Sequence, residues 1–250
     1  MRIFVDPAEL RAGELIVRGD EHHYLARVRR ARPGDLVELV DGAGRRAAAT
    51  IARIAAGETT LHAGPPERVA GKPPFVRALV PLIKGDRMED CIEKLVEVGV
   101  DAIVVWPAAR SVARPPDARR DGRRDARRDA RLAKYRAIAQ AAARQSGRAQ
   151  VPEVAVAGDL AAAIAGLPEL GPADGPGPSL RLLLDPTSDA ALDPGGAADV
   201  TVISGPEGGL APDELDRLTG FTPLGLGPRV LRAETAPVIA VALIRAATRS

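Results

Sequence analysis

The sequence predicts an α/β protein in which a small β-barrel precedes a larger domain built on a parallel sheet. Three observations lead to this prediction. Short apolar segments alternate with turn residues up to residue 63, a Pro- and Gly-rich segment follows at 64–74, and an apolar run, an amphipathic helix and a second apolar run then form a β-α-β unit. A chain of 250 residues with 46% hydrophobic content can fill one large core or two modest ones.

The N-terminal part is predicted to hold five short strands. They lie at 2–5, 14–17, 35–40, 47–54 and 59–63. Turn residues separate them, among them PGD at 33–35 and DGAG at 41–44. Short, evenly spaced strands are typical of a small barrel. The segment DEHHYLARVRRA at 20–31 interrupts the strands and predicts a helical turn capped by Asp20.

A linker is predicted at 64–74, GPPERVAGKPP, because its Pro and Gly content favours neither helix nor strand. We therefore assign residues 1–72 to the first domain and 73–250 to the second. The run FVRALVPLI at 75–83 has no polar alternation, which is typical of a strand buried on both faces.

A helix is predicted at 86–99, DRMEDCIEKLVEVG, because its apolar residues recur with helical spacing. Asp86 and Glu89 have the spacing of a capping box, and Gly99 suits a left-handed end. Cys91 falls on the apolar face, so it is expected in the core rather than as a nucleophile.

The remaining elements continue the α/β alternation. Strands are predicted at 101–107, 180–185, 199–205 and 222–227, and helices at about 129–145, 159–165, 212–218 and 235–250. The segment LGPADGPGPS at 170–179 is expected to be a surface loop.

Charge is concentrated in one segment. Residues 110–148 contain 13 Lys and Arg against 4 Asp, a net charge of +9, whereas the remainder has 22 basic and 29 acidic residues and a net charge of −7. Within 115–131, aspartates recur every four residues, so this stretch fits a self-neutralised solvated helix as well as a polyanion-binding arm. The arginines around it favour a phosphate-facing surface. We expect Arg144→Ala or Arg148→Ala to weaken RNA binding and to reduce its salt dependence.

Two glycine turns follow predicted strands. SGPEGGLAPDE at 204–214 can be a purely architectural strand–helix turn or a backbone cradle for a ligand. Pro212 suits the first helical turn, whereas Ala211 is a poor N-cap. A second turn lies in LGLGPRVLRAETA at 224–236, and a third strand ends in LLLDP at 182–186. Together these strand ends predict an apolar crevice that suits adenosine without phosphates, because no phosphate-loop lysine accompanies it.

Several classes of function are disfavoured. No His, Cys and Asp cluster has metal-ligand spacing, so no metal is expected. A single cysteine excludes an intramolecular disulfide and fits a reducing compartment. No secretory signal is recognised and no apolar run reaches the ~20 residues of a membrane span, so a cytoplasmic protein without a membrane partner is expected.

Five motifs in register carry a resemblance to a known family. They are KGDRMEDCIEKLVEVGV at 84–100, RSV at 110–112, QSGRAQVPEV at 145–154, GPEGGL at 205–210 and LGPRVLRAETA at 226–236. The chain resembles the RsmE-type ribosomal RNA uridine-N3-methyltransferases of the SPOUT superfamily. HHYLARVRRARPGDLVELVDGAGR at 22–45 resembles their PUA-like barrel domain. The chain departs from the family pattern at Arg29, at Ala109 and in the repetitive stretch 115–131.

The resemblance implies the fold and the activity. It implies an α/β domain with a C-terminal trefoil knot, S-adenosylmethionine as cofactor, and methylation of N3 of one uridine in the decoding region of 16S ribosomal RNA. It also implies the small ribosomal subunit as partner and a homodimer with its site near the subunit interface.

Site residues follow from the motifs. We expect Glu207 as general base or orienter and Arg232 as stabiliser of the uracil anion. A hydrogen bond that closes its own glycine turn is the structural alternative for Glu207. The residues expected to bind the cofactor are Leu184, Gly205, Gly208, Gly209, Leu224, Leu226, Gly227, Leu231 and Ala236. The residues expected to bind RNA are Arg30, Arg110, Arg144, Arg148 and Arg229.

Two other functions stay open from the residues alone. A non-catalytic, ribosome-associated RNA-binding protein would share the basic surface but bind no cofactor. A small-molecule nucleotide-binding enzyme would leave the basic segment unexplained. Methyl transfer from labelled S-adenosylmethionine to small subunits that lack the modification separates the three.

Overall fold

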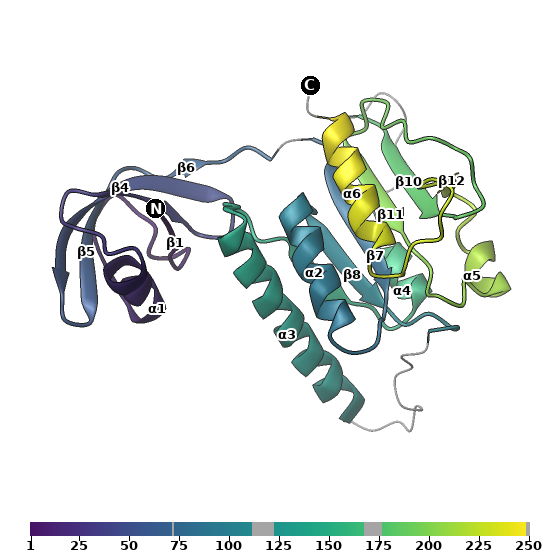
Figure 1. Cartoon of the computed structure of the whole chain (residues 1–250), viewed down its shortest axis with the longest axis horizontal. Coiled ribbons are helices and arrows are strands. Elements are labelled where there is room, and N and C mark those ends of the chain that lie inside the picture. Colours follow the sequence, from purple (N-terminus) through teal and green to yellow (C-terminus); the bar gives the residue numbers. More distant parts are fainter. Residues whose placement is uncertain (72, 112–122, 168–176, 249–250) are drawn as a thin grey trace. The chain divides into compact units, whose positions relative to one another are not determined.

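The chain divides into two compact units (Figure 1). The computed structural model describes residues 1–71, 73–111, 123–167 and 177–248. The first unit comprises Met1–Gly71 together with Ala143–Val151, and the second comprises Lys72–Ala142 and Pro152–Ser250. The predicted division at residues 72 and 73 did not include this return of residues 143–151 to the first unit.

The first unit is a curled mixed sheet. Its strands are β1 (Arg2–Phe4), β2 (Gly13–Arg18), β3 (Leu36–Val40), β4 (Arg45–Ala55), β5 (Glu58–Ala63) and β6 (Glu67–Arg68). The order is β1-β3-β4-β5-β2, and β6 pairs with β4. The five predicted strands are confirmed. The prediction of a linker over all of 64–74 is wrong, because β6 belongs to the sheet and Arg46 Nε lies 2.7 Å from Glu67 Oε1.

The helical interruption of the first unit begins two residues earlier than a cap at Asp20 requires. The helix α1 (Gly19–His23) continues as a π-helical turn, η1 (Tyr24–Val28). Gly19 has a φ of +60°, a conformation open to glycine, and starts the helix directly after extended Arg18. Asp20 therefore lies inside the first turn, where a negative charge is still favourable, and its predicted role as N-cap is wrong.

The second unit is built on an all-parallel sheet. Its strands are β7 (Phe75–Pro81), β8 (Ala102–Trp106), β9 (Glu153–Val156), β10 (Ser179–Leu184), β11 (Asp199–Ile203) and β12 (Thr222–Leu224), in the order β12-β10-β11-β7-β8-β9. Burial of Val76, Leu79 and Val80 on β7 confirms a strand covered on both faces. The strand β9 escaped prediction because it is a four-residue edge strand beside Pro152.

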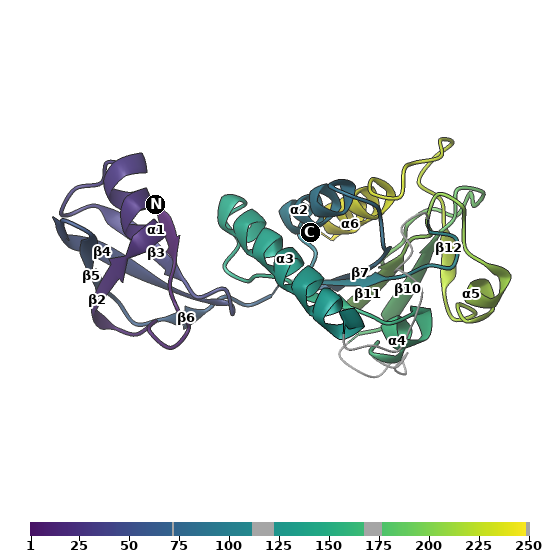
Figure 2. The ribbon, with the colours of Figure 1, turned by 90° about the horizontal axis from the view of Figure 1, so that it is seen from below.

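Helices cover both faces of this sheet. The helices that follow β7 in the chain are α2 (Arg87–Val98), α3 (Arg123–Gln145), α4 (Leu160–Ala165), α5 (Pro212–Asp216) and α6 (Ala236–Ala247). Figure 2 shows α2 and α6 on one face and α4 on the other. The helix α3 begins six residues before the predicted start at 129. Residues 115–122 of the Arg- and Asp-rich stretch and most of the predicted loop 170–179 lie outside the described residues.

The helix α2 confirms its predicted apolar face and its end at Gly99, which has a φ of 104°. The predicted capping box is wrong. Asp86 has helical dihedral angles and makes no side-chain capping bond, because a capping side chain needs an extended backbone at this position. Glu89 instead forms an ion pair with Lys134 of α3.

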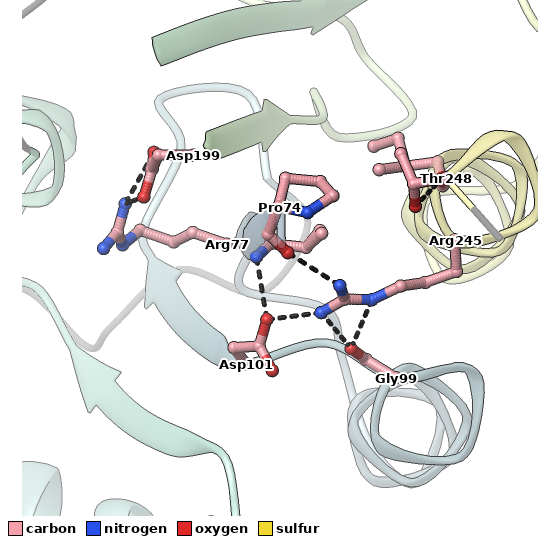
Figure 3. A network of polar contacts seen from close by, with 9 residues as sticks. Pro74, Arg77, Gly99, Asp101, Asp199, Arg245 and Thr248 are labelled. Atoms are coloured by element: carbon pink, nitrogen blue, oxygen red, sulfur yellow. Dashed lines mark hydrogen bonds and ion pairs between the residues drawn. The ribbon is translucent and has the colours of Figure 1, made fainter. Parts of the chain in front are cut away.

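A polar network fixes the C-terminal helix α6 to the start of the sheet (Figure 3). Arg245 donates to the carbonyl oxygen of Gly99 at 2.9 and 2.7 Å and to that of Pro74 at 2.7 Å, and it pairs with Asp101. Asp101 also accepts the amide hydrogen of Val76 at 2.9 Å. One guanidinium thus joins α6, the end of α2 and the residues that begin β7 and β8.

Candidate functional site

A cavity of about 320 Å³ lies at the carboxyl ends of β10, β11 and β12. Open parallel sheets bind ligands at this edge. Its walls come from the loops after these strands and are mostly leucine and backbone. The lining residues are Leu183, Leu184, Asp185, Pro186, Ser204, Gly205, Pro206, Glu207, Gly209, Leu210, Leu215, Leu224, Leu226, Arg229, Val230, Leu231, Ala233 and Ala236.

Two glycines let the loops of the cavity pass close to one another. A Cβ on Gly225 would lie 1.9 Å from the carbonyl oxygen of Ser188, so only glycine fits where the loop after β12 meets the loop after β10. Gly209 has a φ of +70°, and its amide hydrogen bonds the carbonyl oxygen of Pro206 at 2.9 Å. The backbone therefore closes this turn.

Most residues expected to bind the cofactor line the cavity. They are Leu184, Gly205, Gly209, Leu224, Leu226, Leu231 and Ala236. Gly208 and Gly227 are not among the lining residues. Gly208 packs against Arg110, and Gly227 has a φ of +101° within its own turn. Asp185 and Ser204 line the cavity without having been selected, although they lie in the segments LLLDP and SGPEGGLAPDE.

Glu207 lies at the cavity with an arginine beside it. Its Oε1 is 3.7 Å from Nη1 of Arg87, and the two side chains are 45% and 56% exposed. Sequence reasoning did not select Arg87, although it follows the strand at 75–83 and so had to lie at the same sheet edge. Such an exposed pair contributes little to stability, so it can open at little cost when a substrate arrives.

The two arginines of the motif LGPRVLRAETA differ in position. Arg229 lines the cavity. Arg232 does not, and its side chain is 77% exposed with Nη1 3.9 Å from Glu234. Its expected role as stabiliser of the uracil anion stays a prediction.

The residues expected to bind RNA are spread over both units. Arg110 and Arg229 lie in the second unit, and Arg30, exposed with a φ of 50°, lies in the first with Arg144 and Arg148.

Arg144 has partners within the first unit. It lies 2.7 Å from Glu21 and above the ring of Phe4 at 5.4 Å. Burial raises the pKa of Glu21, and the charge of Arg144 acts against this rise. Arg144 thus helps to hold the segment 143–151 to the sheet.

The described residues contain no group of three or more His, Cys, Asp and Glu side chains that could hold a metal ion. Cys91 is buried, and burial raises its pKa to about 12. His22 shares a hydrogen bond of 2.9 Å between Nδ1 and Thr59 Oγ1. Over the same residues, none of the helices combines the length and the apolar character needed to cross a membrane.

Comparisons with known proteins agree over nearly the whole chain. A family model described as an RNA methyltransferase domain matches residues 72–245, and one described as an RNA methyltransferase PUA domain matches 17–61. The chain is 35% identical to ribosomal RNA small subunit methyltransferase E of Mycobacterium bovis, over 98% of this chain and 90% of the relative. It is 27% identical to the Bacillus subtilis protein of that name, over 91% of this chain and 88% of the relative.

Solved structures show the same two-domain fold. The ribosomal RNA small subunit methyltransferase E of Neisseria gonorrhoeae, bound to S-adenosyl methionine, is similar with a TM-score of 0.78 and 25% identity, over 98% of this chain and 96% of that one. A putative methyltransferase of Legionella pneumophila in complex with the same cofactor has a TM-score of 0.77 and 27% identity, over 98% and 97% of the two chains. The expected SPOUT-type α/β domain with a PUA-like domain before it is confirmed, and the knot stays a prediction.

Proposed function

Because the chain belongs to the RNA methyltransferase family that contains the curated ribosomal RNA small subunit methyltransferases E, we propose that it methylates N3 of a uridine in the decoding region of 16S ribosomal RNA, with S-adenosylmethionine as methyl donor. The observation that carries the proposal is the leucine-lined cavity at three parallel strand ends, with the carboxylate of Glu207 at its wall.

The cavity fits this cofactor. Its volume of about 320 Å³ falls at the lower end of the range of small-molecule sites, ~300–1,000 Å³. Leucine side chains from three loops offer an apolar surface to an adenine, and backbone groups offer partners for its edge. Asp185 supplies negative charge near a cofactor whose ammonium and sulfonium groups are cationic. When bound, the cofactor supplies an electrophilic methyl group.

We infer that Glu207 acts on the acceptor. Uracil N3 keeps its proton at neutral pH, so transfer requires that this proton be taken up as N3 attacks the methyl carbon. Glu207 follows β11, and Arg87 follows β7, and these adjacent strands are where the chain order of the sheet reverses. Such a switch point is the usual place of a ligand crevice. The carboxylate of Glu207 accepts the N3 proton at the wall of the cavity.

Arg87 is better placed than Arg232 to stabilise negative charge on the uracil. It lies beside Glu207, whereas Arg232 is not a lining residue of the cavity. N3 is on the Watson–Crick edge, so the uridine must be unpaired when it enters. The guanidinium of Arg87 then faces a carbonyl oxygen of the base as the proton leaves for Glu207.

The wider assembly belongs to the same proposal. Arg110 and Arg229 hold phosphates of the ribosomal RNA near the site, and Arg30 does so from the first unit. The chain works as a homodimer in the cytoplasm, where its ribosomal substrate is made.

Two measurements test the function. Labelled S-adenosylmethionine is incubated with small ribosomal subunits that lack the modification, and the product nucleoside is identified by mass spectrometry as N3-methyluridine. Transfer to another atom or to no RNA would exclude the proposal.

Glu207→Gln tests the base in the same assay. We expect turnover to fall about 10²–10⁴-fold with cofactor affinity unchanged, because the amide cannot accept the proton. Normal turnover would remove Glu207 from this role.

A further inference from the structure

We propose that Glu214 is a positioning residue that couples the loop carrying Arg110 to the glycine turn carrying Glu207. The inference rests on the proposed function for its consequence, but its structural part stands on contacts that need no ligand. Glu214 lies on α5, one turn after the glycine turn, and was not selected from the sequence as a functional residue.

Glu214 is a buried carboxylate with two backbone partners. Only 5% of the residue is exposed. Its Oε1 accepts the amide hydrogen of Ala109 at 2.8 Å, and its Oε2 accepts the amide hydrogen of Ala211 at 2.8 Å. The second bond is the N3-to-N-cap half of a capping box, in which the Glu214 side chain binds the amide hydrogen of the N-cap residue Ala211. The first bond reaches across 105 positions of sequence to the loop after β8.

The loop and the glycine turn are also in direct contact. A Cβ on Gly208 would lie 3.2 Å from both the Cβ and the carbonyl oxygen of Arg110, so the two backbones approach closely there. Nη1 of Arg110 donates to the carbonyl oxygen of Gly208 at 3.5 Å. Gly208 is therefore a contact point between the two segments rather than a wall of the cavity.

These contacts span the switch point of the sheet. The strand order β11-β7-β8 places the end of β7 between the glycine turn and the loop after β8. Glu214 joins the two outer segments across this point, and Arg87 follows the strand between them. The position of Arg110 relative to Glu207 thus depends on this carboxylate together with the direct contact at Gly208.

Only a glutamate suits this task. Two amide hydrogens converge on the group, and an ionised carboxylate offers an acceptor oxygen to each. A glutamine would turn its amide nitrogen, which is a donor, toward one of them. An aspartate is shorter by one methylene and would not span both bonds.

The first experiment measures the coupling without substrate. Hydrogen exchange of the peptides around 107–111 and 205–211 is compared in the wild-type chain, Glu214→Gln and the matched control Asp213→Asn, which changes an exposed carboxylate on the same turn. We expect faster exchange in both peptides for Glu214→Gln only. Unchanged exchange in 107–111 would overturn the coupling, whether or not the chain is a methyltransferase.

The second experiment measures its consequence for turnover. Glu214→Gln, Arg110→Ala and the double variant are assayed on small ribosomal subunits, well below their unfolding temperatures. We expect kcat of Glu214→Gln to fall about tenfold while its affinity for S-adenosylmethionine stays within about twofold, because Glu207 and Arg110 lose their relative placement. The loss in the double variant should be smaller than the product of the single losses, because both changes act on one contact.

The turnover results separate the positioning role of Glu214 from the proposed function. Full turnover in folded Glu214→Gln overturns the positioning role, and so do multiplicative effects in the double variant. Absent methylation by the wild-type chain would instead sink the proposed function and leave the exchange result as the test of the coupling.

Discussion

Arg87 is the residue on which the structure adds most to the sequence. It faces Glu207 from the neighbouring strand end, and the pair is exposed enough to open. We expect Arg87→Ala to lower kcat/KM about 10–100-fold, since it removes charge stabilisation from the uracil anion. Cofactor affinity should stay unchanged, because Arg87 is not a lining residue of the cavity.

The control for Arg87 is Lys94→Ala on the same helix. Lys94 pairs with Glu93 and Glu97 on α2 and should not affect turnover when removed. Steady-state kinetics of both variants on small subunits check the assignment. Equal activity of Arg87→Ala and the wild-type chain would return the role to Arg232.

The buried thiol of Cys91 leads to a prediction about how the stability of the fold depends on pH. Burial, and next the charge of Glu234, raise its pKa to about 12, from an ordinary value of 9.0. The folded state therefore keeps the thiol proton that the unfolded state loses above pH 9. The stabilisation is complete below pH 9 and is lost as the pH rises toward 12.

Unfolding experiments at pH 8 and pH 10 check this sign. We expect the wild-type chain to lose about 1 kcal/mol more stability between the two pH values than Cys91→Ala, which has no thiol. An alkylating reagent at pH 8 should label Cys91 only after unfolding. Rapid labelling of the native protein would contradict the burial.

At the scale of elements, Arg245 connects α6 to the rest of its unit (Figure 3). Its side chain is 17% exposed and that of Asp101 is 20% exposed. We expect Arg245→Ala to reduce the free energy of unfolding by about 2–4 kcal/mol, because it leaves Asp101 and two carbonyl groups without this donor. Cofactor affinity should fall as well, since Ala236 at the start of α6 lines the cavity.

Denaturant unfolding and calorimetric titration measure the two effects of Arg245→Ala. Arg217→Ala is a suitable control, because this arginine is exposed and directly follows the short helix α5 of the same unit. A loss of stability no greater than in the control would show that the network in Figure 3 contributes little.

The elements that sequence predicted best are those whose pattern depends on burial. β7 and α2 were identifiable because a strand covered on both faces and a helix covered on one have distinct apolar periods. The caps at Asp20 and Asp86 failed, because a cap depends on local dihedral angles that residue type does not fix. β9 failed because an edge strand of four residues carries too short a pattern.

The sequence predicted most of the selected residues that line the cavity, but not the arginine that lies beside Glu207. Strand ends of a parallel sheet share one edge, so the motifs around Gly205 and Leu226 had to meet there. The partner of Glu207 depends on strand order, and strand order is a property of the whole sheet. The sequence selected Arg232 from the motif LGPRVLRAETA, and its role stays a prediction, whereas the sheet brings Arg87 to the carboxylate.

At the scale of the whole molecule, two exposed apolar residues of α6 offer a test of the proposed homodimer. Ile239 and Leu243 are one helical turn apart and are 38% and 44% exposed. If this face forms the proposed homodimer, Leu243→Glu should give a monomer in sedimentation experiments, because a charge would be buried in the interface. Val28→Glu, at an exposed apolar residue of the first unit, should leave the dimer intact. A monomeric wild-type chain would exclude the dimer.

The return of residues 143–151 to the first unit has a consequence for dissecting the protein. Gln150 bridges to Gly42, Val151 donates its amide hydrogen to the carbonyl oxygen of Gly42 at 2.9 Å, and Arg144 covers Phe4. An RNA-binding fragment cut at Gly71 would therefore expose an apolar ring and lose a bound peptide. A usable fragment would need the nonapeptide 143–151 added in trans or grafted onto its end, as in split-protein complementation.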